Sequence, residues 1–292
     1  MTTEDTVWHG LSAAEVDRQY ALRKLRPDYE KEMVPGWLER SAHHRDIHPG
    51  ARIDLGYGPG DRDRFDLFPA QNPEGPFLIY IHGGYWQRGD KSVYSILSKP
   101  FTDVGIDVAL INYNLCPTVR MRDIIPQVRR AVAHIWREAR NLGCPRGRFC
   151  VMGHSAGGHL TAEMMATDWT AEADDLPADL IDAASPSSGV FAFEPMLYCG
   201  ENDGLCLDLA EAREVSTLFR APTTNAPQLV AWGELETPDW IRQSTDYVEA
   251  ITSGGRKVET CVVPACDHFD VVDALADGGS DITKKTIALV RG

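Results

Sequence analysis

A serine between two glycines, placed where an apolar run meets a helical pattern, constrains this chain more than any other feature. Gly153–Gly157 follows the apolar run Arg148–Met152 and precedes the helical pattern Gly158–Ala166. The glycines allow a tight turn, since a Cβ at either position would crowd the neighbouring strand or helix. We therefore expect Ser155 to stand at the end of a buried strand, before a helix whose free N–H groups favour developing negative charge.

A second glycine-rich loop follows another predicted strand. The apolar run 76–81 leads directly into His82–Trp86. Glycine lets backbone N–H groups turn inward and approach a substrate closely. We expect His82 to brace this loop rather than to catalyse. The expected oxyanion hole consists of Gly83, which shapes the loop, and the backbone N–H groups of Gly84, Tyr85 and Ala156.

The two motifs together are typical of the α/β-hydrolase fold, in which a His-Gly-Gly loop precedes the G-x-S-x-G turn. The chain alternates strand and helix patterns, which predicts an α/β class with a mostly parallel central sheet and helices on both faces. We expect a single domain over 1–292, whose N-terminal helical segment, 1–48, packs near the pocket mouth. The expected strands are 52–55, 64–68, 76–81, 106–113, 148–152, 180–184, 228–232 and 259–263, and the expected helices include 12–25, 29–39 and 122–142.

In this fold the acid and the histidine follow the serine in that order. Three carboxylates lie in Glu234–Asp239, after the predicted strand 228–232. Glu236, three residues past Gly233, is the first choice for the acid and Glu234 the second, while Asp239 fits the first turn of a helix. His268 follows the last predicted strand, where the general base must lie to reach the serine.

These residues predict acyl transfer to water. Because serine is a poor nucleophile at neutral pH, His268 must take its proton while Glu236 fixes the imidazole tautomer and stabilises the imidazolium. The acyl-enzyme formed on Ser155 is then hydrolysed by water. An ester or an amide would serve as substrate, and no cofactor is needed.

The chain resembles the arylformamidase (kynurenine formamidase) branch of the α/β-hydrolases. The resemblance implies an arylformamidase-like amide hydrolase, with N-formylkynurenine as one expected substrate, although the acid in that branch is usually Asp rather than Glu. The same machinery also suits a small-substrate carboxylesterase, and a non-catalytic binding protein is disfavoured by the complete triad. The resemblance rests on Gln19–Tyr20, His82–Gln87, Asn112–Pro117, the serine turn, Ser188–Phe191 and Glu236–Ser244.

Aromatic residues near the predicted site favour an aryl substrate. We expect Tyr85, Trp86 and Tyr113 to contribute to substrate binding, since aromatic rings stack on aryl groups. For Trp86, packing beneath the N-terminal helices is an equally good interpretation. Whether these helices act as a lid is not readable from the sequence.

Composition sets limits on partners and location. The net charge of −14 argues against nucleic acid and anionic membranes, and disfavours strongly anionic substrates unless a local pocket overrules the net field. The seven cysteines lack C-x-x-C spacing, and the N-terminus lacks a signal-peptide pattern, which together predict a cytoplasmic protein. A small-molecule substrate is the expected partner, and the oligomeric state stays open, a homodimer included.

His43, His44 and His48 cluster without matching Cys or carboxylate spacing, so we predict a polar loop there rather than a metal site.

Overall fold

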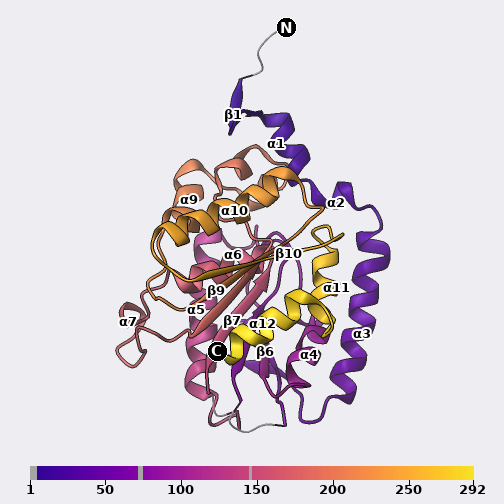
Figure 1. Cartoon of the computed structure of the whole chain (residues 1–292), viewed down its shortest axis with the longest axis vertical. Helices are drawn as coiled ribbons and strands as arrows, with labels where there is room; N and C mark the ends of the chain where they lie inside the picture. The colour runs from indigo at the N-terminus through magenta and orange to yellow at the C-terminus, as the bar shows by residue number, and fades with distance from the viewer. Residues whose placement is uncertain (1–4, 72–74, 145–146) are drawn as a thin grey trace.

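An eight-stranded sheet organises the computed structural model, which describes residues 5–71, 75–144 and 147–292 (Figure 1). The spatial order of its strands is β10-β9-β8-β7-β5-β6-β4-β3. Strands β5 to β10 run parallel, whereas β4 is antiparallel to both β3 and β6. The mostly parallel sheet is therefore confirmed. The strands are β3 (Arg52–Gly56), β4 (Arg64–Phe68), β5 (Phe77–Ile81), β6 (Asp107–Ile111), β7 (Phe149–His154), β8 (Ala183–Ser187), β9 (Gln228–Gly233) and β10 (Val258–Val263).

Helices cover both faces of this sheet, as expected. Helices α5, α6 and α10 lie on one face, and α4, α11 and α12 lie on the other (Figure 1). The central strands β5 and β7 are buried throughout, which explains why they are continuous apolar runs rather than alternating patterns. The helices on the two faces are α4 (Lys99–Thr102), α5 (Met121–Glu138), α6 (Ala156–Met165), α10 (Pro238–Ser253), α11 (Asp270–Ala276) and α12 (Asp281–Arg291).

Strand register brings the two glycine-rich loops together. Ile81, the last residue of β5, pairs with Gly153 of β7. The loop that follows β5 therefore begins beside the turn that follows β7. Because the carboxyl ends of parallel strands share one edge of a sheet, loops after β5, β7, β9 and β10 can meet there.

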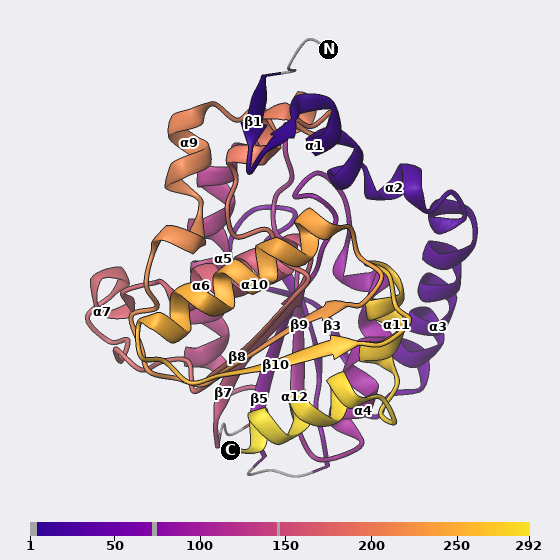
Figure 2. The same cartoon turned by 45° about the horizontal axis from the view of Figure 1, so that its top comes forward.

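The N-terminal segment crosses this edge of the sheet. The predicted helix 12–25 is two helices, α1 (Ala13–Tyr20) and α2 (Leu22–Leu25), with a break at Ala21. Ser12 and Glu15 form a capping box at the start of α1. A π-helical turn, η1 (Tyr29–Met33), leads into α3 (Val34–Ile47), and Figure 2 shows β9 and β10 pointing toward α11 and α3.

Several local predictions were wrong. The residues His43 and His44 belong to α3 rather than to a polar loop, and His44 is buried with its Nε2 2.8 Å from Ser98 Oγ. The strand predicted over 180–184 is shifted to 183–187 because its apolar start, Leu180 and Ile181, packs in the core before the strand begins. The elements that sequence patterns missed are short: β1 (Thr6–Trp8), β2 (Leu11–Ser12), α7 (Trp169–Glu172), α8 (Asn202–Leu205) and α9 (Leu209–Glu214).

Candidate active site

Ser155 occupies a strained turn between β7 and α6. Its φ of 59° and ψ of −121° lie in a region that L-residues rarely adopt. The flanking glycines make the turn sterically feasible: a Cβ at Gly157 would lie 1.9 Å from the carbonyl oxygen of Ile81, and one at Gly153 would lie 2.3 Å from that of Gly157. The N–H of Ser155 donates to Ser187 O at 2.9 Å, which ties the turn to β8. The sheet thus holds the serine in a conformation that it would not adopt alone.

A buried histidine and a buried glutamate lie beside this serine. His268 Nδ1 is 3.3 Å from Glu236 Oε1, and both side chains are almost completely buried. His268 and Ser155 line the same small cavity. The indole of Trp240 packs edge-on against the imidazole, with ring centroids 4.7 Å apart, and donates its own N–H to Ser188 O. The imidazole is therefore held from two sides, by the carboxylate and by the indole.

The two candidate acids have different surroundings. Glu234 is exposed and its carboxylate accepts from the backbone N–H of Ala265 at 2.8 Å. Glu236 alone faces His268. Gly233 allows this arrangement, since a Cβ there would lie 2.4 Å from Cys266 O, inside the loop that carries the histidine. The geometry therefore favours the first of the two candidates that the sequence left open.

Backbone N–H groups of the loop after β5 point to no internal acceptor. Gly84 has a φ of 120° and Tyr85 a φ of 54°. Among residues 5–71, 75–144 and 147–292, no group accepts a hydrogen bond from the N–H of either. Ala156 opens α6, so its N–H has no intrahelical partner. A Cβ at Gly83 would lie 3.0 Å from Ser155 Cβ, which shows how closely the loop approaches the serine.

His82 braces this loop, as predicted. Its side chain is fully buried and its Nδ1 lies 2.7 Å from Gly83 O. The imidazole stacks on Tyr113, with centroids 4.4 Å apart, and the Tyr113 hydroxyl donates to His82 O at 2.7 Å. Burial lowers the pKa of His82 to about 4, which keeps the ring neutral at pH 7.

The end of α1 connects the loop after β5 to the loop after β9, a link that sequence patterns did not predict. The hydroxyl of Tyr85 donates to Tyr20 O. The hydroxyl of Tyr20 in turn donates to Asp239 Oδ2 at 2.9 Å and accepts from Gln243 Nε2 at 2.7 Å. Gln19 adds a second attachment, since its Oε1 accepts from the N–H of Asp239. The resemblance had singled out Gln19 and Tyr20, but only the structure shows what they hold together.

Arg26 attaches the same N-terminal segment to the histidine loop. Its guanidinium pairs with Asp267 and with Asp270, the latter at 3.1 Å. Asp267 also accepts from the N–H of Phe269 at 2.8 Å, so the residues on both sides of His268 are fixed. The segment that follows Ser12 therefore restrains three loops of the site at once.

The cavity at Ser155 is narrow and its wall is largely aromatic. Its volume is about 20 Å³, enough for about one water molecule. Tyr29 stacks on Phe269 with centroids 4.0 Å apart and meets Trp37 edge-on at 5.8 Å. Sequence patterns did not predict most of this wall, because its residues come from the N-terminal segment and from α11 and the loop before it. The lining residues are Leu22, Arg23, Tyr29, Trp37, Gly83, Gly84, Tyr85, Arg88, Tyr94, His154, Ser155, His268, Phe269 and Val272.

Of the three aromatic residues expected to bind substrate, only Tyr85 lines this cavity. Trp86 is buried against His159 and Phe193, at centroid distances of 5.4 and 5.0 Å. Tyr113 is buried beneath His82. The structure thus gives Trp86 and Tyr113 packing contacts under the loop instead of a place on the cavity wall.

Burial also sets the protonation of the site. It lowers the pKa of His268 to about 3 and that of His154 to about 3, so both imidazoles are neutral at pH 7. Burial raises the pKa of Glu236 to about 7. A neutral imidazole hydrogen-bonded to a carboxyl group is ready to accept a proton from a neighbouring hydroxyl.

The described residues form neither a metal site nor a membrane-spanning helix. Within the described ranges, no three His, Cys, Asp or Glu side chains are grouped so that they could hold a metal ion. None of the helices in that part of the chain has the length and apolar character needed to cross a bilayer.

Known proteins resemble the chain over different lengths. The family model BD-FAE matches residues 65–189, which include both glycine-rich loops. The chain is 28% identical to a kynurenine formamidase of Danio rerio, covering 97% of this chain and 98% of that protein. It is 26% identical to a kynurenine formamidase of Drosophila melanogaster, covering 80% of each.

Solved structures share the architecture. A crystal structure of a candidate thioesterase from Silicibacter sp. TM1040 superposes with a TM-score of 0.81 at 29% identity, covering 95% of this chain and 99% of that one. An esterase from Pyrobaculum calidifontis superposes with a TM-score of 0.71 at 17% identity, covering 92% of each chain. The predicted fold class is confirmed by these structures.

Proposed function

We propose that this chain, a formamidase-like α/β-hydrolase of the serine-hydrolase type, uses Ser155, His268 and Glu236 to hydrolyse aryl formamides. The observation that carries the proposal is the convergence of three features around one cavity. They are a strained serine, a neutral histidine hydrogen-bonded to a buried glutamate, and backbone N–H groups that have no acceptor among the described residues. This combination suits acyl transfer and has no evident structural purpose, since strain and unpaired donors both cost stability.

In the proposed reaction, His268 takes the proton of Ser155 as its Oγ attacks the acyl carbon. Glu236 holds the imidazole through Nδ1 and stabilises the imidazolium that forms. The N–H groups of Gly84, Tyr85 and Ala156 donate to the oxyanion, and each such donor is worth about a hundred- to a thousandfold in turnover. His268 then passes the proton to the leaving amine, and water hydrolyses the acyl-enzyme by the reverse sequence.

Two observations support an aryl formamide. The cavity at Ser155 has little room beyond the serine, which suits a small acyl group such as formyl. Its wall carries the rings of Tyr29, Trp37, Tyr94 and Phe269. An aryl leaving group can pack against these rings once they move apart, since the cavity as it stands holds about one water molecule. The relatives named kynurenine formamidase make N-formylkynurenine the first substrate to test.

A small-substrate carboxylesterase is the second candidate. The same triad and oxyanion donors cleave esters as well as amides, and the relatives at lower identity include a methylesterase of Arabidopsis thaliana, 22% identical over 90% of this chain. The choice between the two depends on the leaving group.

Hydrolysis of N-formylkynurenine and of p-nitrophenyl acetate, by wild type and by Ser155→Ala, tests the proposal. We expect formamide turnover that the substitution reduces by at least a thousandfold. Ester turnover alone, equally dependent on Ser155, would transfer the assignment to the esterase. Equal rates for wild type and variant on both substrates would refute the nucleophile assignment.

We also propose that the protein acts in the cytoplasm and that residues 1–292 form one domain. A homodimer is one of the oligomeric states to be tested. The seven cysteines support a reducing compartment, since all are free thiols and five are buried. Mass determination in solution would decide the oligomeric state.

A further inference from the structure

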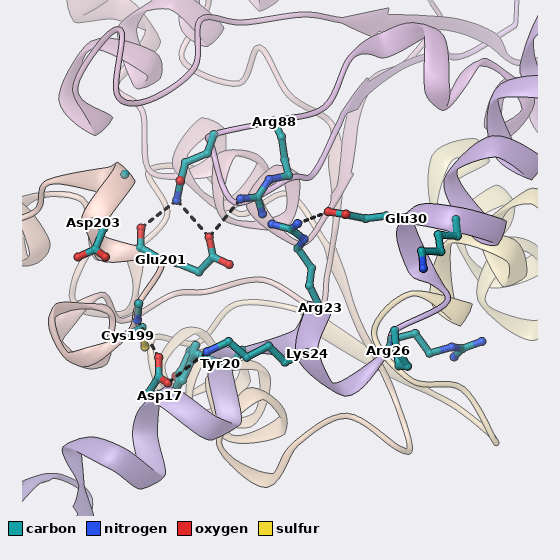
Figure 3. A pocket seen from close by; sticks show the side chains of 16 residues that line it. Asp17, Tyr20, Arg23, Lys24, Arg26, Glu30, Arg88, Cys199, Glu201 and Asp203 are labelled. Carbon is teal, nitrogen blue, oxygen red and sulfur yellow. Dashed lines mark hydrogen bonds and ion pairs between the residues drawn. The ribbon is translucent and has the colours of Figure 1, made fainter.

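An outer cavity adjoins the one that contains Ser155. Its volume is about 540 Å³, against about 20 Å³ for the inner cavity. Residues of α1 to η1 form one side, and the segment 199–204 forms the other (Figure 3). Arg23 and Arg88 line both cavities, and they alone do so among the residues on either wall. A substrate that reaches the serine from the outer cavity therefore passes these two guanidinium groups.

Both arginines have hydrogen-bonding capacity to spare. Arg23 pairs with Glu30, whose side chain is 59% exposed, and Arg88 pairs with Glu201 at 3.4 Å. Arg23 Nε and Arg88 Nη1 are nevertheless buried with no acceptor in the part of the chain that the structure describes. A buried N–H without an acceptor costs about 1 to 3 kcal/mol, and more when the group is charged. Each guanidinium group therefore has an N–H that its glutamate partner does not satisfy.

The arrangement of charge favours an anion at this point. Figure 3 shows the guanidinium groups of Arg23 and Arg88 next to each other, between Glu30 and Glu201. Both positive charges also act on the Tyr29 hydroxyl, where they oppose the rise that burial causes in its pKa. Five basic and four acidic residues line the outer cavity, although the whole chain carries a net charge of −14. The lining therefore has a formal charge of +1, in contrast to the strongly acidic chain as a whole.

We propose that Arg23 and Arg88 bind a carboxylate on the leaving group of the substrate and so select aryl amides that carry an acid at the end remote from the scissile bond. The inference rests on the proposed function, which it deepens from an aryl formamide to an anionic one. A carboxylate fits the two unpaired N–H groups, because its oxygens can accept from two guanidinium groups at once. The rest of the leaving group would then extend from the outer cavity toward Ser155, where the acyl group lies.

A pair of substrates that differ only in this charge tests the proposal. The substrates are N-formylkynurenine and its primary carboxamide, with formate release as the readout. We expect wild type to prefer the acid at least tenfold in kcat/KM, and Arg23→Gln or Arg88→Gln to reduce that preference about tenfold while the carboxamide changes less than threefold. Lys24→Gln is the matched control, since it removes one positive charge from the outer cavity only.

Equal losses on both substrates, or an unchanged preference in both arginine variants, would overturn the proposal. A second measurement does not depend on formamide turnover. Benzoate and benzamide are compared as protectants against labelling of Ser155 by a fluorophosphonate. We expect benzoate to protect at lower concentrations than benzamide in wild type and in Lys24→Gln, but not in Arg23→Gln or Arg88→Gln. Equal protection by both compounds in wild type would refute the carboxylate site. Labelling that persists in Ser155→Ala would instead refute the proposed nucleophile and leave the carboxylate site untouched.

Discussion

Replacement of Glu236 by Gln tests how the buried acid contributes to turnover. The carboxylate lies 3.3 Å from His268 Nδ1 and both groups are buried. An imidazolium and a carboxylate about 4 Å apart attract each other by about 4 kcal/mol at an effective dielectric constant of about 20. Because the imidazolium forms only as Ser155 loses its proton, this attraction acts mainly on the transition state. Its loss corresponds to about a thousandfold in kcat.

The pH profile separates this electrostatic role from a merely structural one. Burial raises the pKa of Glu236 to about 7, whereas it lowers that of His268 to about 3. As the pH falls through 7, Glu236 takes up a proton and loses the charge that stabilises the imidazolium. The wild-type kcat/KM should therefore fall as the pH is lowered from 8 to 5.5. In Glu236→Gln no group of this pair titrates in that range, so we expect a low but flat profile.

Glu234→Gln is the matched control, measured with the same substrate and buffers. Glu234 is exposed, and the amide oxygen of Gln can still accept from the N–H of Ala265, so kcat should stay within about threefold of wild type. Retention of more than a tenth of the activity by Glu236→Gln would refute the reasoning. A similar loss in Glu234→Gln, or an unchanged pH dependence in Glu236→Gln, would do the same.

Two further predictions concern the N-terminal segment. Tyr20→Phe removes the hydroxyl that donates to the buried Asp239 carboxylate, and it should lower the free energy of unfolding in urea by about 2 to 3 kcal/mol. Tyr198→Phe, at an exposed tyrosine, serves as its control, and equal effects would contradict the network. Burial lowers the pKa of His44 from 6.5 to about 4. Below about pH 6.5, His44 is therefore protonated in the unfolded chain but stays neutral in the folded chain until the pH approaches 4. Stability should therefore fall between pH 7 and pH 5, and His44→Gln should remove about 2 kcal/mol of that fall, unlike the exposed His43→Gln.

Local sequence determined the parts of the site that depend on backbone conformation. The glycines at 153 and 157 make the turn between strand and helix possible, since a Cβ at Gly153 would lie 2.3 Å from Gly157 O and one at Gly157 would lie 1.9 Å from Ile81 O. The same holds for the loop after β5, where glycine permits a φ of 120° at Gly84. The apolar runs predicted the central strands because a strand buried on both faces carries apolar side chains on both of them.

Contacts between side chains that are distant in the sequence were determined by the tertiary structure. The sequence of residues 234–239 left Glu234 and Glu236 both open as the acid. The structure places Glu236 Oε1 3.3 Å from His268 Nδ1 and leaves Glu234 exposed. The break at Ala21 has no strong sequence signal, yet it directs Tyr20 toward Asp239 and α2 toward the cavity.

Sequence alone therefore determined that this chain places a serine in a tight turn at the edge of a mostly parallel sheet, since backbone sterics act within a few residues. Tertiary structure decided what surrounds it. The aromatic wall from Tyr29 and Phe269, and the pair Arg23 and Arg88, come from segments more than fifty residues from the serine. Side-chain packing between distant segments depends on how every element is oriented, and a local pattern contains no record of that.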